Sequence, residues 1–235
     1  MLHFIPSTES TQDDLHDRAA AGAPEGTAVV AGMQTVGRGS RGRRWDSPAG
    51  GLWMSVLCRP ATEPALEVLS LRVALAVCGT LDRIFPGLPL LLKWPNDLLL
   101  NDRKLGGILC EARWQGASVG WVVVGLGLNL TNPISAALAA QAINLEVVVP
   151  SPTPAMLAPL MADSIVCASR LGGMLSDAEI EAYRRRDWLH GRQLVEPAVG
   201  RAEGITSRGE LQVADPSGSV SLRRTGTVIL RTNSR

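Results

Sequence analysis

Residues 90–130 contain four short apolar segments with only a few residues between them, and this run restricts the possible fold more than any other part of the chain. Short apolar segments with such brief connections are typical of consecutive β-strands. The turn-forming pair Asn101-Asp102 indicates a hairpin between two of them. We therefore expect a mixed sheet that contains strands at 90–94, 97–100, 105–113 and 119–130.

Helices are expected on either side of this run. Ser10, with Asp13 three positions later, predicts a capped helix at 10–21. Ser176 and Glu179 have the spacing of a capping box, which would open a helix at 176–189. The other expected elements are helices at 66–85 and 153–171 and strands at 27–34 and 52–58. The pattern predicts an α+β fold, with a mixed sheet flanked by helices.

The composition changes near residue 189. From there on, short β-compatible runs alternate with glycine turns, which is typical of a small β-barrel. The runs lie at 193–196, 201–205, 210–215, 220–223 and 227–230. We therefore predict two domains, at residues 1–188 and 189–235.

Composition excludes several classes of protein. The 235 residues, 46% of them hydrophobic, are enough for one sizeable core. With 23 basic and 22 acidic residues the formal charge is +1, so no global charge favours DNA or an anionic membrane. The four cysteines form no CxxC pair, and no run of apolar residues is long enough for a membrane span. We expect a cytoplasmic protein that binds neither DNA nor a membrane.

The loop at 37–44 combines glycine and arginine. Its Gly37-x-Gly39-x-x-Gly42 spacing formally matches the dinucleotide-binding fingerprint, but that motif needs a helix to open at its last glycine. Residues 43–51 contain Pro and two Gly there, which disfavours the Rossmann interpretation. A phosphate-binding loop remains, as does an exposed loop or a small RNA-binding patch. The cations of the loop are Arg38, Arg41, Arg43 and Arg44.

Three further motifs are ambiguous when taken singly. In KWPND, Lys93 and Asp97 interrupt an apolar run, which is compatible with a polar site or with a structural ion pair at a bulge. RKLGGIL at 103–109 places a cation before paired glycines, as a hairpin end also could. In GLGLN, Gly125 and Gly127 lie on one face of a strand, where they would leave room for a ligand or for a helix.

Together and in this order, these motifs resemble the catalytic domain of the biotin protein ligases over nearly the whole chain. Ser10-Thr11-Gln12 is similar to the family's N-terminal Ser-Thr-Asn element, and Gln34 to the glutamine before its loop. The loop, KWPND, RKLGGIL and GLGLN follow in family order. The resemblance implies a fold like that of the class II aminoacyl-tRNA synthetases and biotin ligases, with an SH3-like C-terminal barrel.

The resemblance also implies a reaction. ATP and biotin would give biotinyl-5′-adenylate, and a lysine of a biotin carboxyl carrier protein would then attack it, so no enzyme nucleophile is needed. Mg²⁺ would arrive with ATP, and no protein metal ligand is assigned. The implied catalytic residues are Arg38, Lys93, Asp97 and Lys104. The implied biotin-binding residues are Ser10, Thr11, Gln12, Gln34, Arg38, Gly39, Ser40, Lys104, Gly107, Gly125 and Gly127. Those for ATP and the adenylate are Arg38, Arg41, Arg43, Trp45, Lys93, Asn96, Lys104 and Asn129.

Some positions depart from the family pattern. Ser40 stands where many relatives have a basic residue, which predicts weaker retention of the adenylate. Thr227 stands where relatives often have an acidic residue. Catalytic sequence starts within about ten residues of the N-terminus, so we expect no DNA-binding domain of the repressor type. Two alternatives remain: a lipoate or octanoate ligase or transferase of the same superfamily, and a non-catalytic nucleic-acid-binding module. A homodimer is compatible with the sequence.

Overall fold

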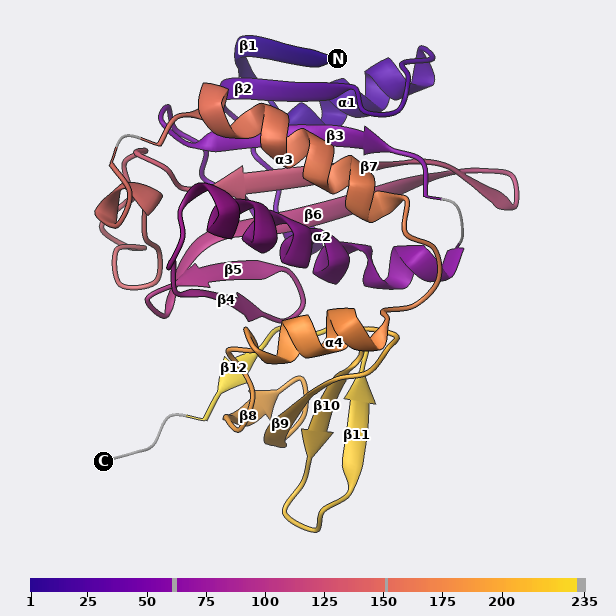
Figure 1. Ribbon diagram of the computed structural model, residues 1–235, viewed down its shortest axis with the longest axis vertical. Helices are drawn as coiled ribbons and strands as arrows, with labels where there is room; N and C mark the ends of the chain where they lie inside the picture. Colours follow the sequence, from indigo (N-terminus) through magenta and orange to yellow (C-terminus); the bar gives the residue numbers. More distant parts are fainter. Residues whose placement is uncertain (61–62, 151, 232–235) are drawn as a thin grey trace.

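A computed structural model describes residues 1–60, 63–150 and 152–231 (Figure 1). Within these ranges, seven strands form the large sheet in the order β1-β2-β3-β7-β6-β5-β4. Their bounds are β1 Leu2–Thr8, β2 Ala28–Gln34, β3 Leu52–Cys58, β4 Leu90–Lys93, β5 Asp97–Leu100, β6 Arg103–Gln115 and β7 Ser118–Leu128. The predicted run of consecutive strands at 90–130 is confirmed as the antiparallel part β4-β5-β6-β7.

Strand β1 was not predicted from the sequence. It pairs parallel to β2 at the edge of the sheet, whereas the other pairs of this sheet are antiparallel. None of its residues is fully buried, and Phe4 is exposed. An edge strand has one partner only, so it shows little of the apolar pattern by which buried strands are recognised.

Helices cover both faces of this sheet. They are α1 Thr11–Ala20, α2 Glu63–Ile84 and α3 Pro154–Ser169. A fourth helix, α4 Asp177–Arg184, lies next to the C-terminal sheet (Figure 1). Two 3₁₀ turns, η1 Ser40–Gly42 and η2 Leu145–Val147, accompany them. In Figure 1, α2 and α3 lie across the near face of the large sheet. On the opposite face α1 packs through Leu15 and Ala19 against Val29, Leu57 and Val123.

The predicted caps have different outcomes. At α4 the capping box is present, since the Ser176 hydroxyl accepts from the Glu179 N–H and the Glu179 carboxylate accepts from the Ser176 N–H. At α1 the prediction was wrong, because Ser10 occupies the N-cap position without a capping hydrogen bond from its side chain. The Ser10 hydroxyl is instead buried beside the cavity described below.

The C-terminal residues form a second sheet of short strands. They are β8 Gln193–Glu196, β9 Gly200–Ile205, β10 Leu211–Ala214, β11 Val220–Arg223 and β12 Ile229–Leu230. Their order, β11-β10-β9-β8-β12, is an open sheet over the described residues rather than the closed barrel that we predicted. The predicted domain 189–235 includes 232–235, which lie outside the described residues.

This small sheet is joined to the large one by packing and hydrogen bonds. Apolar residues such as Leu194 and Leu211 belong to the same buried cluster as the main core. The indole of Trp94 donates to the Gly209 carbonyl at 2.9 Å. Residues 186–188 do not continue α4 as predicted, because the Trp188 N–H donates to the Leu92 carbonyl and pairs the chain with β4. The domain boundary at 188 stays a prediction.

Candidate functional site

A cavity of about 550 Å³ lies on the α1 side of the large sheet. Its walls come from the start of α1, the loop at 38–46, strands β3, β5, β6 and β7, and the segment at 129–142. Every site residue predicted from the sequence lines it except Arg41. Segments that are far apart in sequence therefore meet at one place, as the combined motifs predicted.

Glycines form the floor of the cavity. Gly107 of β6 pairs with Gly127 of β7, and a Cβ added at Gly107 would lie 3.5 Å from the side chains of Lys104 and Trp45. A Cβ at Gly127 would come within 2.8 Å of the Trp45 indole, and one at Gly125 within 2.8 Å of the Gln12 amide. The side chains of Gln12 and Trp45 thus lie against the backbone of Gly125 and Gly127 at a distance that only glycine permits, whereas a Cβ at Gly107 would make ordinary contacts.

A set of hydroxyls and amides closes one end of the cavity. Gln34 accepts from both the backbone N–H (2.9 Å) and the hydroxyl (3.1 Å) of Thr11, and donates to the Ser47 hydroxyl at 2.8 Å. The Thr11 hydroxyl also lies 2.8 Å from that of Ser55. In the described part of the chain, the buried Ser10 hydroxyl has no hydrogen-bond partner. Buried polar groups normally have partners, so this end is suited to a polar ligand.

Ser55 was missed by the sequence interpretation. It is the register partner of Gly125 across the β3–β7 pair and lies in an otherwise apolar strand. One serine in such a strand gives little signal. Its position beside two predicted site residues became evident only from the sheet order.

Lys104, Asp97 and Trp45 form the second end. The Lys104 ammonium lies 2.6 Å from the Asp97 carboxylate and 4.9 Å from the centre of the Trp45 ring. Asp97 is the register partner of Gly107, so the ion pair lies directly beside the glycine floor. The Trp45 N–H is buried and has no partner within the described residues. The arrangement places one cation and one aromatic face at the same point of the cavity.

Two predicted nucleotide-binding amides are engaged by the protein itself. The Asn96 amide donates to the Ile108 carbonyl at 2.7 Å and so ties the turn between β4 and β5 to β6. Asn129 donates to the Lys104 carbonyl at 3.4 Å and accepts from Asn132 at 3.2 Å. Both residues line the cavity, and their contacts with a nucleotide stay predictions.

The glycine and arginine loop turns tightly at η1, where Arg41 has a positive φ of 61°. Arg43 donates to the Ser40 hydroxyl at 3.1 Å, within the loop. Arg41 points away from the cavity and donates to the Thr227 hydroxyl at 2.6 Å. The loop is thus tied to the connection between β11 and β12 through Thr227, the residue that departs from the family pattern.

Lys93 borders the cavity next to Trp188, another residue that the sequence interpretation missed. Its ammonium lies 5.4 Å from the centre of the Trp188 ring, and Arg192 lies 4.1 Å from the same ring. The indole N–H of Trp188 donates to Asp102 at 2.5 Å. Burial, partly opposed by Asp97, lowers the pKa of Lys93.

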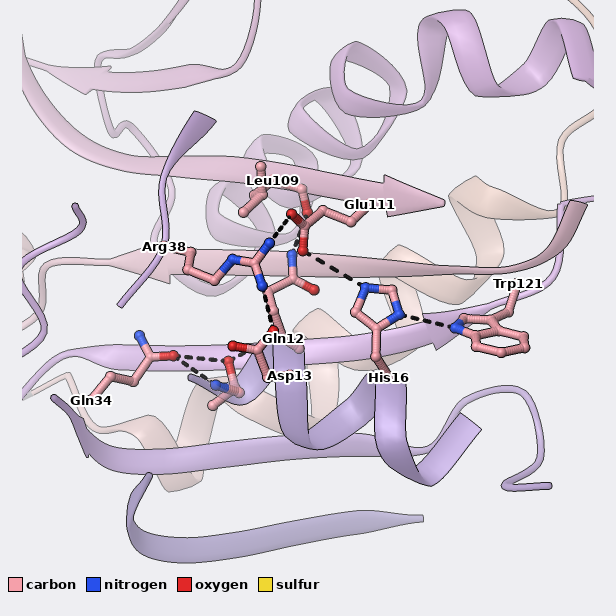
Figure 2. A network of polar contacts seen from close by, with 10 residues as sticks. Gln12, Asp13, His16, Gln34, Arg38, Leu109, Glu111 and Trp121 are labelled. Atoms are coloured by element: carbon pink, nitrogen blue, oxygen red, sulfur yellow. Dashed lines mark hydrogen bonds and ion pairs between the residues drawn. The ribbon is translucent and has the colours of Figure 1, made fainter. Parts of the chain in front are cut away.

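Arg38 is held by two carboxylates. Its guanidinium donates to Asp13 of α1 and, at 2.5 Å, to Glu111 of β6 (Figure 2). Neither acid was predicted as a site residue, and Asp13 was assigned only to the cap of the first helix, because their relation to Arg38 depends on how α1 lies on the sheet. Among the described residues, no group of three or more His, Cys, Asp or Glu side chains is placed to hold a metal ion. No helix in that part of the chain is long and apolar enough to cross a membrane.

Comparison with known proteins agrees with this geometry. Residues 4–129 match the sequence profile of the biotin/lipoate A/B protein ligase family. The chain belongs to this family. A biotin–[acetyl-CoA-carboxylase] ligase of Paracoccus denitrificans is 32% identical over 233 residues, which cover 94% of this chain and 93% of that one.

Two further relatives differ in coverage. The bifunctional ligase/repressor BirA of Bacillus subtilis is 42% identical over 123 residues, which cover 52% of this chain but only 38% of the relative. The biotin protein ligase of Aquifex aeolicus in complex with biotin and ATP has a TM-score of 0.82 at 25% identity, over 98% of both chains. The likeness therefore extends over the fold as a whole, whereas the chain spans well under half of the bifunctional relative.

Proposed function

We propose that this chain is an ATP-dependent biotin protein ligase. It forms biotinyl-5′-adenylate from biotin and ATP, then transfers biotin to a lysine of a biotin carboxyl carrier protein. The observation that carries the proposal is that Arg38, Lys93 and Lys104 border one cavity whose floor is bare glycine backbone. The matches to biotin ligases over the full chain support it.

Different parts of the cavity suit the ureido ring, the bicyclic ring and the carboxylate of biotin. The ureido ring would bond the hydroxyls and amides around Ser10, Thr11 and Gln34, where the unpartnered Ser10 hydroxyl supplies a further group. The bicyclic ring would lie on Gly125 and Gly127, displacing the side chains that now cover them. The carboxylate would then point toward Lys104.

In the first step, a carboxylate oxygen of biotin attacks the α-phosphorus of ATP, and the bond to the β-phosphate breaks to release pyrophosphate. Lys104 and Arg38 would neutralise the charge that gathers at the α-phosphate, while Lys93 and Arg43 would hold the outer phosphates. ATP brings Mg²⁺ to the site as part of the substrate. Trp45 would stack on adenine after leaving the glycine floor.

In the second step, the carrier lysine amine attacks the biotinyl carbonyl, the bond to the phosphate oxygen breaks, and AMP leaves. Asp97, now paired with Lys104 at 2.6 Å, would orient the amine and accept its hydrogen bond. The fixed positions of these groups supply the catalysis, since both nucleophiles belong to substrates.

We further propose that the protein is cytoplasmic, binds neither DNA nor a membrane, and forms homodimers. The near-neutral net charge supports the statement that the protein binds neither DNA nor an anionic membrane. The exposed Phe4 on the edge strand β1 supports the last. Sedimentation analysis of the protein tests the oligomeric state.

The family description also covers lipoate, so lipoate ligation is the second candidate function. Pyrophosphate exchange into ATP, measured with biotin, lipoate or octanoate in turn, separates them. Exchange with biotin only, followed by labelling of a carrier domain, is expected. Exchange with lipoate but not biotin would overturn the proposal, and exchange with none of the acids would also exclude the lipoate alternative.

A further inference from the structure

A buried histidine lies behind the Arg38 site. His16 is on α1, one turn after Gln12, and faces Glu111 of β6 and Trp121 of β7 (Figure 2). Its side chain is 7% exposed. No step of the proposed reaction uses it.

The protonation of His16 is fixed by its neighbours. The Trp121 indole N–H can only donate, and it lies 3.0 Å from Nδ1 of His16, so Nδ1 must accept. A ring that accepts at Nδ1 is neutral, and burial with the nearby Arg113 lowers the pKa of His16 in the same direction. The one proton of the neutral ring is therefore on Nε2, which faces Oε2 of Glu111 at 3.7 Å.

Neither of these facing atoms is satisfied. Nε2 of His16 and Oε2 of Glu111 are both buried, and neither has a hydrogen-bond partner among the residues that the structure describes. The other oxygen of Glu111 accepts from Arg38. A donor and an acceptor thus face each other slightly too far apart to bond while Arg38 holds Glu111.

The two carboxylates around Arg38 oppose the binding of a substrate anion. One guanidinium between two carboxylates leaves a net negative charge, which repels a substrate anion. These bonds use two of the five N–H groups of Arg38, so donors remain, but the guanidinium attracts a substrate carboxylate or phosphate at full strength only when both carboxylates have released it. Asp13 is 53% exposed and returns to water at little cost, but Glu111 would then still neutralise Arg38, so it must release Arg38 as well. Glu111 is 21% exposed, and its largely buried charge would lose its partner.

We propose that His16 is a positioning residue for Arg38. When Arg38 turns from Glu111 to the substrate anion, the Nε2–H of His16 bonds Glu111 in its place, and so lowers the cost of the exchange. This inference rests on the proposed function of Arg38, and it assigns a role to a residue that does not touch the substrate.

A matched pair of variants tests the proposal in the biotin-dependent assay of pyrophosphate exchange into ATP. His16→Gln keeps an N–H donor near the position of Nε2, whereas His16→Leu removes it at similar volume. His16→Leu should raise the KM for biotin about tenfold, which corresponds to about 1.4 kcal/mol, and leave kcat within about twofold. His16→Gln should stay near the wild-type KM.

A double-mutant cycle with Glu111→Gln separates this role from simple packing. Without the Glu111 charge, Arg38 can leave residue 111 at little cost, so His16 has no charge left to compensate. His16→Leu should then leave the KM for biotin unchanged in the Glu111→Gln background. An equal rise in both backgrounds, or no rise in either, would overturn the proposal. Thermal unfolding of each variant shows whether it folds. If His16→Leu does not fold, the test rests on His16→Gln, and a KM for biotin well above the wild-type value in that variant overturns the proposal. If the wild-type chain shows no biotin-dependent pyrophosphate exchange into ATP, the ligase function itself is refuted.

Discussion

Gly106 and Gly107 are neighbours on β6, yet substitution by alanine should affect them in opposite ways. Successive side chains of a strand point to opposite faces, so a methyl at Gly106 enters the core and one at Gly107 enters the cavity. At Gly106 the added Cβ would lie 2.5 Å from the Gly127 carbonyl oxygen and 2.4 Å from Leu128. At Gly107 its nearest neighbours are at 3.5 Å, an ordinary contact distance.

The magnitudes follow from these distances. Forcing a methyl into a packed core costs about 1–3 kcal/mol, and Gly106 lies at the upper end because a backbone oxygen cannot move aside. Gly107→Ala meets no clash, and the reduced freedom of the unfolded chain should stabilise it by about 0.4–1 kcal/mol. The methyl would, however, take space from the ligand, and one such group changes binding by about 10–200-fold.

Urea unfolding and biotin titration of both variants measure the two effects. We expect Gly106→Ala to lose stability, and Gly107→Ala to keep or gain stability while binding biotin at least tenfold more weakly. Equal destabilisation of both variants would refute the assignment of the two faces. Unchanged biotin binding by a stable Gly107→Ala protein would refute the position of biotin on the glycine floor.

Three other predictions concern single side chains. Lys104→Ala should slow adenylate formation about 10²-fold or more in single-turnover measurements, and near-normal rates would contradict its role at the α-phosphate. Ser40→Arg should lengthen the time for which the bound adenylate is retained, measured by its release on dilution; equal lifetimes would count against a weak lid. Burial alone raises the pKa of Glu179, but hydrogen bonds from Arg72 and Ser176 outweigh it and hold that pKa low. The contribution of this carboxylate to the free energy of unfolding is therefore fully present above the unfolded-state pKa of about 4.3, and it is lost as the pH falls through the lower pKa of the folded state. Acid unfolding of Glu179→Gln should accordingly depend less on pH than that of the wild type.

The order and type of most elements could be predicted because their signals are local. Strand β3 at Leu52–Cys58 and the box at Ser176 depend on residues adjacent in sequence, and the structure has both. Ser10 shows the limit of such signals. Its sequence context is that of a capping residue, but the nearby cavity wall, made by distant strands, determines where its hydroxyl lies.

Residues of the site could be predicted from the sequence only where they belong to a recognisable motif. Glu111 and His16 belong to no motif that the sequence interpretation used, and each looks like an ordinary polar residue of a strand or a helix. Their contact depends on α1 crossing the face of β6 and β7, which needs the tertiary structure. Arg41 is the converse case: its place in a phosphate-type loop predicted nucleotide binding, which stays a prediction, while in the structure it bonds Thr227 and does not line the cavity.

The pairing of Ser55 with Gly125 also has a consequence for folding. Strands β4 to β7 pair with close neighbours in sequence and can form early, whereas β3 and β7 are separated in sequence by α2 and strands β4 to β6, so their pairing is slow. The cavity spans this junction, so neither half of the sheet contains a complete ligand site. Ligand should therefore slow hydrogen exchange most at amides along β3 and β7, because only the joined state binds it.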